Sequence, residues 1–134
     1  MRFIGTRTVR SVVGMSAGTN TKDFVVPAGY SYRVTSVVLY NPDAAARACG
    51  ISIIDGTNHL ENLTYAAALA AGAEKDAFMD TPLALVKGGD SHWAKAASTI
   101  RAIWAGMTGG NSAIVVYTWE IWKEGDSTKE APLG

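Results

Sequence analysis

Few side chains in this 134-residue sequence have the types and spacing that catalysis or metal binding needs. His59 and His92 are its two histidines, and Asp55, Asn58 and Asp90 are the polar residues near them in the sequence. No two of them stand at a ligand spacing such as C-x-x-C or H-x-x-x-H, and a structural zinc ion needs four good ligands. We therefore interpret them as polar residues that flank turns, and we expect no bound metal.

Two other features also favour a structural role over catalysis. Cys49 is the single cysteine, and its setting, Ala-Cys-Gly-Ile, matches no protease signature, so we expect a buried strand cysteine. The glycine-rich stretch 106–110 lacks the Lys and Ser/Thr of a phosphate-binding loop and precedes a strand, which indicates a hairpin loop. Carboxylates such as Glu61 and Asp80 have no distinguishing spacing. The sequence thus predicts a protein that is not an enzyme and has no cofactor.

Composition narrows the class of protein further. Twelve basic residues balance twelve acidic ones, and phosphate binding needs a clustered positive surplus, so we expect no nucleic-acid partner. One cysteine allows no intrachain disulfide, which favours a reducing site of synthesis. No apolar run approaches the roughly 18 residues of a membrane span, and the first residues lack the apolar stretch of a signal peptide. We expect a soluble protein made in a cytoplasm, without a membrane partner.

Short runs of β-branched and aromatic residues alternate with turn residues about every ten to twelve positions, and no long amphipathic helix interrupts them. Segment 59–71 fits either a helix or a strand, and the hairpin residues before it favour a strand over 59–66. Pro82 indicates an edge or a break within 76–86. This pattern predicts an all-β fold, an antiparallel β-sandwich of jelly-roll type with eight or nine short strands. The expected strands are 6–13, 24–26, 30–41, 49–54, 59–66, 76–86, 91–96, 99–105 and 113–123.

We expect three parts along the chain. Residues 1–21 form an N-terminal arm with a first strand and a loop over 14–21, and residues 22–123 form the sandwich. Residues 124–134 are charged, lack core residues and are expected to form a flexible tail. The alanine-rich segment 44–48 has the composition of a single helical turn.

The longest expected strand has two different faces, because successive side chains point to opposite sides of a sheet. One face is nearly all apolar and is expected in the core. The other begins polar and ends apolar with Val37 and Leu39, so we expect its distal half to be covered by the domain or by a partner. The first face comprises Tyr30, Tyr32, Val34, Ser36, Val38 and Tyr40, and the second comprises Ser31, Arg33, Thr35, Val37 and Leu39.

The last expected strand has an apolar face that includes Trp119, which predicts that Trp119 lies in the core. Trp104 shares a face with Ile100 and Ala102 in the strand before it. Trp122 points the other way, and such amphipathic rings often anchor interfaces. A second buried layer or cover by the tail would also account for Trp122, and stacked sugars are a further possible use of the tryptophans. The apolar side chains without an evident partner in the chain, and hence the predicted protein interface, are Phe3, Ile4, Val37, Leu39 and Trp122.

Three stretches together resemble a known group of proteins. They are residues 24–41 with the turn Val-Pro-Ala-Gly, the segment Leu69-Ala-Ala-Gly72, and residues 82–96 with Pro-Leu-Ala-Leu-Val-Lys-Gly-Gly-Asp-Ser. Their order is similar to that of small β-sandwich structural proteins of tailed bacteriophages, among them capsid decoration proteins and head-fibre or tail appendage domains. The resemblance covers residues 22–122 and rests on turn-and-strand motifs.

The resemblance implies a non-enzymatic virion component, often trimeric, with no catalytic residues to carry over. We expect a capsid decoration (cement) protein that is made in the host cytoplasm, binds the outside of the shell and stabilises it. Its expected partners are other virion proteins, the major capsid protein first, and further copies of itself in a trimer. The alternative is a neck, fibre or tail appendage domain that binds other virion proteins or a host surface glycan.

Overall fold

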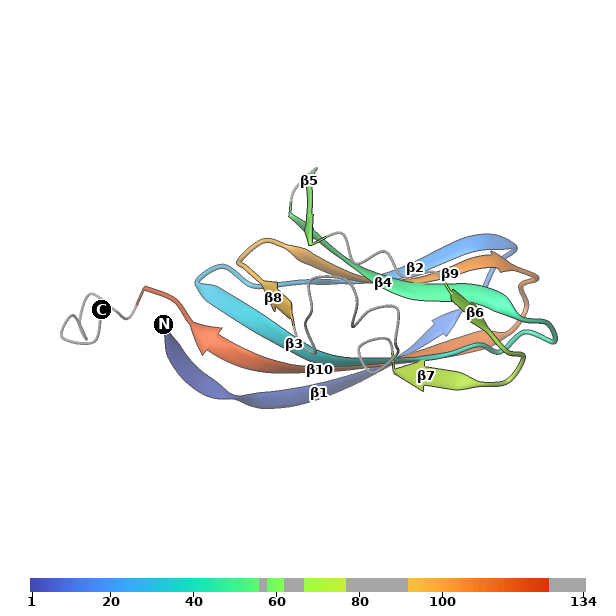
Figure 1. Cartoon of the computed structure of the whole chain (residues 1–134), viewed down its shortest axis with the longest axis horizontal. Coiled ribbons are helices and arrows are strands. Elements are labelled where there is room, and N and C mark those ends of the chain that lie inside the picture. The colour runs from blue at the N-terminus through green and yellow to red at the C-terminus, as the bar shows by residue number, and fades with distance from the viewer. Residues whose placement is uncertain (56–57, 62–66, 77–91, 126–134) are drawn as a thin grey trace.

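The computed structural model describes residues 1–55, 58–61, 67–76 and 92–125, and in these ranges the chain is all β. Two antiparallel sheets pack face to face, with sheet A below and sheet B above in Figure 1. The strands are β1 (Arg2–Gly14), β2 (Gly18–Val25), β3 (Tyr30–Tyr40), β4 (Arg47–Asp55), β5 (Asn58–Glu61), β6 (Ala67–Leu69), β7 (Glu74–Asp76), β8 (His92–Ala94), β9 (Thr99–Met107) and β10 (Ser112–Lys123).

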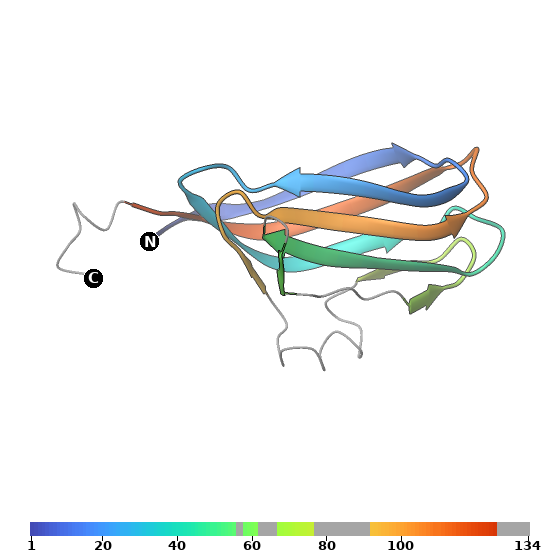
Figure 2. The same ribbon diagram turned by 90° about the horizontal axis from the view of Figure 1, so that it is seen from above.

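The order of the strands is that of a jelly roll. Sheet A has the order β1-β10-β3-β7, with β8 also paired to β3, and sheet B has the order β2-β9-β4-β5, with β6 also paired to β4. The chain crosses from one sheet to the other at each step from β1 to β4 and again from β8 to β10 (Figure 2). Within these two stretches, consecutive strands therefore lie in different layers. The predicted antiparallel sandwich of jelly-roll type is therefore confirmed.

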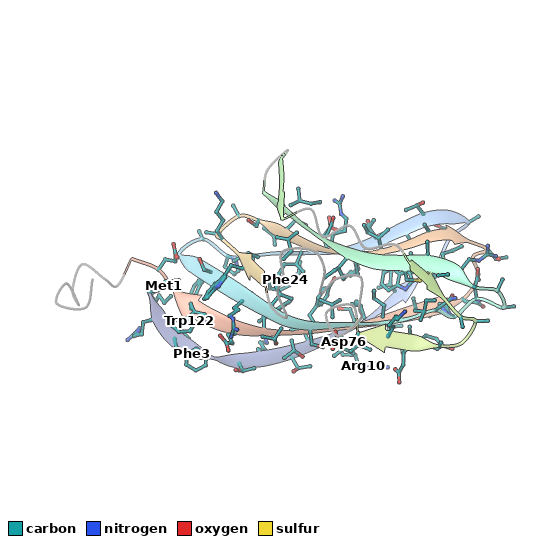
Figure 3. All side chains as sticks on the ribbon, in the orientation of Figure 1. Met1, Phe3, Arg10, Phe24, Asp76 and Trp122 are labelled. Carbon is teal, nitrogen blue, oxygen red and sulfur yellow. The ribbon has the colours of Figure 1, made fainter. Side chains whose placement is uncertain are left out.

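The core lies between the sheets and follows the alternation of side chains along β9 and β10. Trp104 on β9 and Trp119 on β10 have no exposed surface. Phe24 points between the layers in Figure 3, and the centroid of its ring lies 4.3 Å from the ring centroid of Trp119. The predictions that Trp119 and Trp104 belong to the core, and that 99–105 and 113–123 are strands, are confirmed. The inward side chains of the two strands are Ile100, Ala102, Trp104, Ala113, Val115, Tyr117 and Trp119.

A β-bulge interrupts β3 and reverses which of its side chains face the core. Thr118 on β10 pairs with Ser36, and the next residue, Trp119, pairs with Val34, so Thr35 is one residue too many for the ladder. The Thr35 hydroxyl donates to the Thr118 carbonyl, 3.2 Å away. Beyond the bulge the odd-numbered residues point inward. The expected single apolar face over residues 30–40 is therefore wrong after Thr35.

The bulge also decides the fate of two predicted interface residues. Val37 and Leu39 are 0% and 2% exposed, and both belong to the core of the chain itself. Their prediction as contacts for a partner is wrong, because the extra residue turns them inward. Val38 and Tyr40 take the outward positions instead and are only partly buried.

The N-terminal segment belongs to the sandwich. β1 pairs with β10 from Arg2 to Gly14, and β2 begins at Gly18, so the expected loop over 14–21 shortens to residues 15–17. Gly109 lies against this turn, where a Cβ atom would stand 2.8 Å from the Ala17 nitrogen. The division of the chain at residue 21 is thus wrong, since both early strands help to build the two sheets.

The segments around β4 and the start of the tail confirm one prediction and contradict another. The strand over 49–54 is confirmed as β4, and Asp55 pairs with Asn58 as a hairpin requires. The helical turn expected at 44–48 is absent, because the chain bends and then enters β4. Of the tail, Glu124 is held by its backbone N–H, which donates to the Gly29 carbonyl at 2.8 Å. Most of the predicted strands 59–66 and 76–86, the start of the predicted strand 91–96 and most of the predicted tail fall in residues 62–66, 77–91 and 126–134, which lie outside the described ranges.

A buried polar network holds the turn between β3 and β4. The Asp43 carboxylate accepts bonds from the Arg47 side chain at 2.6 Å, and from the Thr108 backbone N–H at 3.0 Å and hydroxyl at 3.2 Å. The Asn41 amide, which has no exposed surface, donates to the Leu69 carbonyl at 2.8 Å. The network therefore joins three turns at one end of the sandwich, those after β3, β6 and β9.

A matched pair of substitutions tests the bulge. Leu39→Ala should lower the free energy of unfolding by about 2–5 kcal/mol, because it leaves a cavity in the core. Val38→Ala should cost less than about 1 kcal/mol, because Val38 faces outward. Urea denaturation followed by tryptophan fluorescence measures both. If the alternation along β3 were unbroken, Val38→Ala would lower the free energy of unfolding more than Leu39→Ala.

The Asp43 network predicts a dependence of stability on pH. The Thr108 N–H, with further bonds from the Thr108 hydroxyl and Arg47, lowers the pKa of Asp43, and burial opposes this only in part. A lowered pKa in the folded state stabilises the protein above the unfolded value, about 3.9, and this stabilisation is lost as the pH falls through the folded value. Asp43→Asn should lower the urea midpoint at pH 7, and the gap to the unchanged protein should narrow below about pH 4.

Asp23→Asn is the control for this experiment. Asp23 forms a two-pronged pair with Arg101, at 2.7 and 2.9 Å, but both side chains are more than one third exposed. Solvent screens exposed pairs, so its loss should shift the midpoint less than the loss of the Asp43 charge. Equal shifts for the two variants would contradict the role given to the buried network.

Candidate binding surface

The outer face of sheet A carries two apolar groups separated by short polar side chains. This face consists of the side chains of sheet A that point away from sheet B. They come mainly from β1, β10 and β3, whose registers place outward residues side by side. Figure 3 shows Phe3 and Trp122 at one end of this side and Arg10 and Asp76 farther along it.

The first group is the aromatic cluster of Phe3, Trp93 and Trp122. The ring centroids of Phe3 and Trp122 are 5.2 Å apart with an interplanar angle of 60°, and those of Trp93 and Trp122 are 5.8 Å apart at 58°. β1 supplies Phe3 opposite Trp122, and β8 supplies Trp93 opposite Arg33. Phe3 is 49% and Trp93 44% exposed. The cluster is therefore assembled from three strands and leaves much apolar surface in water.

Hydrogen bonds and an ion pair hold the middle of the cluster in place. The Trp122 indole N–H donates to one oxygen of Glu120 at 3.1 Å, and the other oxygen of Glu120 accepts from Arg33 at 3.1 Å. The indole N–H of Trp122 therefore has its hydrogen-bond acceptor within the chain, and the rest of the indole ring is available for apolar contacts. This arrangement fixes the orientation of a ring that a partner would otherwise have to order.

The second group is an apolar hollow of about 210 Å³ on the same face. Its floor comes from Val38 and Tyr40 on β3 and from Ile114 and Val116 on β10. Arg10 on β1 and Glu74 on β7 border it on opposite sides. The hollow exists because the bulge in β3 turns Val38 and Tyr40 outward.

Small polar side chains separate the cluster from the hollow. The hydroxyls of Thr8 and Thr118 are 3.1 Å apart, and the Ser36 hydroxyl donates to Asp76 at 2.7 Å. None of these side chains is large, so at the centre of the face the side chains project less far from the sheet than the rings at its aromatic end. A flat or complementary partner can therefore approach the sheet closely.

The structure brings together part of the predicted interface. Phe3 and Trp122 touch each other, and Ile4, 49% exposed, lies beside them where the register of β1 shifts. Val37 and Leu39 lie in the core of the chain itself. Sequence reasoning missed Trp93 and the four apolar residues of the hollow. The alternation along β10 pointed to Ile114 and Val116, whereas nothing in the sequence marks the bulge that exposes Val38 and Tyr40.

Cys49, predicted as a buried strand cysteine, lies on β4 with little contact with solvent. It is 4% exposed, and burial, together with the negative charge of Asp43, raises the pKa of its thiol to about 11. The expectation of a buried strand cysteine is confirmed. His59 lies on β5 and His92 on β8. Across the described residues, no three His, Cys, Asp or Glu side chains gather as a metal site would require. Within the same ranges no helix is long and apolar enough to cross a membrane.

Comparisons with known proteins add little to this picture. No family model matches the chain, and no curated protein matches it. Among solved structures, a chain from "Structure of infectious bursal disease virus Gx strain" is 12% identical, with a TM-score of 0.34. The alignment covers 96% of this chain and 43% of that one, so this chain spans less than half the length of that protein. A likeness at this level carries no argument about function, and the comparisons do not show the resemblance to tailed-bacteriophage proteins.

The environment of Cys49 predicts its reactivity. Only the thiolate attacks disulfide reagents, and with a pKa of about 11 roughly one thiol in a thousand is ionised at pH 8. A coloured aromatic disulfide at pH 8 should therefore react with the folded protein only as fast as it unfolds. In urea the thiol should react within seconds to minutes. Rapid reaction of the folded protein would show that the thiol is accessible and would contradict its placement.

Proposed function

We propose that this protein is a non-enzymatic structural component of a virion, a capsid decoration protein that binds the outside of the shell and stabilises it. The observation that carries the proposal is the outer face of sheet A, where a jelly-roll sandwich presents exposed aromatic and aliphatic side chains on rigid strands. The motifs over 24–41 and 69–72 support it through their resemblance to virion proteins. Both contain tight turns in the structure, with Gly29 and Gly72 at positive φ.

The residue types on this face are those that dominate binding energy in protein interfaces. Tryptophan and other aromatic side chains are enriched among the few residues whose loss costs most. Phe3, Trp93 and Trp122 pack on one another and Trp122 is tied to Glu120, so little side-chain freedom remains to be lost on binding. A face of this kind supports association with another protein.

Decoration would stabilise a shell by mass action. A subunit that binds the assembled lattice and not its separate parts lowers the free energy of the lattice by RT ln(1 + [L]/Kd) at each site. Many symmetric sites, or attachment through more than one copy, turn modest contacts into long-lived ones. The proposed partner on the shell is the major capsid protein. A neck, fibre or tail position uses the same face against a different virion protein.

Recognition of a host glycan is the second candidate, and the exposed rings of Phe3 and Trp93 favour it. Sugars stack best on a ring whose flat face is free, and a polysaccharide needs several such rings in one plane. Here Phe3 and Trp93 stand at 60° and 58° to Trp122, so the three rings form a compact ridge. The ridge supports a protein partner better than a carbohydrate.

Binding to shells that lack this protein tests the proposed function. The unchanged protein should bind such shells and raise the temperature at which they break apart. Trp93→Ala should weaken the binding at least about tenfold, which corresponds to about 1.4 kcal/mol. Because Trp93 is exposed, its loss should leave the fold intact.

Val25→Ala is the matched control, since Val25 is 58% exposed on β2 of the other sheet. It should change the affinity for shells less than about twofold. If the unchanged protein does not bind the shells, or if Val25→Ala weakens binding as much as Trp93→Ala, the proposal is wrong. A glycan array with strong hits that Trp93→Ala abolishes would favour the second candidate.

A further inference from the structure

We infer that the outer face of sheet A pairs with the same face of a second copy of this chain. The two-fold axis lies midway between sheet A of one copy and sheet A of the other. It runs perpendicular to the strands, at the level of Thr118. This inference goes beyond the proposed function, because it makes a second copy, and not the shell, the direct occupant of this face; the shell would then be met by surfaces outside the interface of the pair. The pair of chains would then attach to the virion as a unit.

The aromatic cluster and the apolar hollow are placed as a two-fold pair requires. On β10, Trp122 comes four residues after Thr118 and Ile114 four residues before it. On β1, Phe3 pairs with Trp122 and Val12, which is 59% exposed, pairs with Ile114. A two-fold axis across the strands reverses their direction, so the cluster of each copy lies over the hollow of the other.

The hollow is large enough for this occupant. Its volume is about 210 Å³, and a cavity of about 150 Å³ is known to accommodate benzene. An aromatic side chain from the cluster of the second copy therefore fits it. The threonines at the centre, Thr8 and Thr118, are short enough for two sheets to pack at the usual distance of about 10 Å.

Charges on the face favour the same arrangement. Next to the cluster, Glu120 on β10 lies opposite Arg33 on β3, and the two side chains pair with each other at 3.1 Å within the chain. The rotation places Glu120 beside Arg10 of the second copy, because Arg10 pairs with Val116 at the mirrored level. It likewise places Arg33 beside the acidic strand β7 of the second copy, which carries Glu74 and Asp76. Opposite charges thus meet on both sides of β10.

Other ways of pairing two copies fit less well. An axis along the strands would set cluster against cluster and leave both hollows empty. Pairing through the free edge of sheet A would bring two β1 strands together, and the side chains of Arg2, Arg7 and Arg10 would repel one another across that contact.

The size of the face suits a reversible pair. Ten residue steps along β10 span about 34 Å, and four strands side by side span about 19 Å, which gives roughly 650 Å² for each copy. The total of about 1,300 Å² lies at the lower end of stable interfaces, which bury about 1,200–2,000 Å². We therefore expect a dimer that dissociates on dilution.

Sedimentation equilibrium over about two decades of concentration around the micromolar range tests the inference. The unchanged protein should fit a monomer–dimer equilibrium. Trp93→Ala should weaken the dimer at least about tenfold, and Val25→Ala should leave it unchanged within about twofold. Urea midpoints and circular dichroism of each variant establish that the fold is intact.

A charge reversal tests the direction of the axis. Arg10→Glu should weaken the dimer at least about fivefold, because it places a second acid beside Glu120 of the other copy. Adding Glu120→Gln to the same chain, which removes the facing charge and keeps an oxygen that can accept from the Trp122 indole N–H, should restore part of the lost affinity. A double variant that stays as weak as Arg10→Glu overturns the proposed axis.

The remaining outcomes separate this inference from the proposed function. A protein that is monomeric at every concentration, or trimeric as its sole assembly, overturns the dimer. If such a protein still binds shells and loses that binding with Trp93→Ala, the proposed function stands and the shell itself occupies the face. A dimer that shows no binding to shells supports the inference and contradicts the proposed function.

Discussion

The single extra residue in β3 is the constraint on which both the core and the outer face depend. A strand presents alternate side chains to its two sides, so one inserted residue exchanges the two sides for everything beyond it. Before Thr35 the even-numbered residues Tyr32 and Val34 are buried, and after it the odd-numbered Val37 and Leu39 are buried. The same exchange exposes Val38 and Tyr40 to the hollow. One backbone irregularity therefore completes the hydrophobic core and shapes the surface opposite to it.

The two ends of the sandwich are held by different physical means. At the end that contains the turn between β3 and β4, charged and amide groups are buried, and each is bonded to backbone or side chains of a neighbouring turn. At the other end aromatic rings are left partly in water and pack on one another. Buried polar groups must be satisfied within the chain, whereas exposed rings gain free energy by being covered. The aromatic end is consequently the one suited to association.

A β-sandwich offers a rigid platform for such association. The side chains of the outer face stand on long strands that pair on both sides, β10 between β1 and β3, so their relative positions are set before any partner arrives. Binding then costs mainly the overall motion of the partners and little internal ordering. A surface of this kind suits a protein that meets the same partner in many equivalent copies.

The amino-acid sequence by itself determined the class of fold and most of the core. The alternation along 99–105 and 113–123 identified Trp104 and Trp119 as core residues, and Gly29, Gly72 and the Asp55–Asn58 hairpin marked turns, because these signals act between neighbours in the chain. Only the tertiary structure decided which side of β3 faces inward, because the bulge is a mismatch between strands far apart in sequence. It also decided that Phe3, Trp93 and Trp122 meet, since three strands from the beginning, the later part and the end of the chain bring them together. Contacts of that kind follow from strand order, which local patterns do not encode.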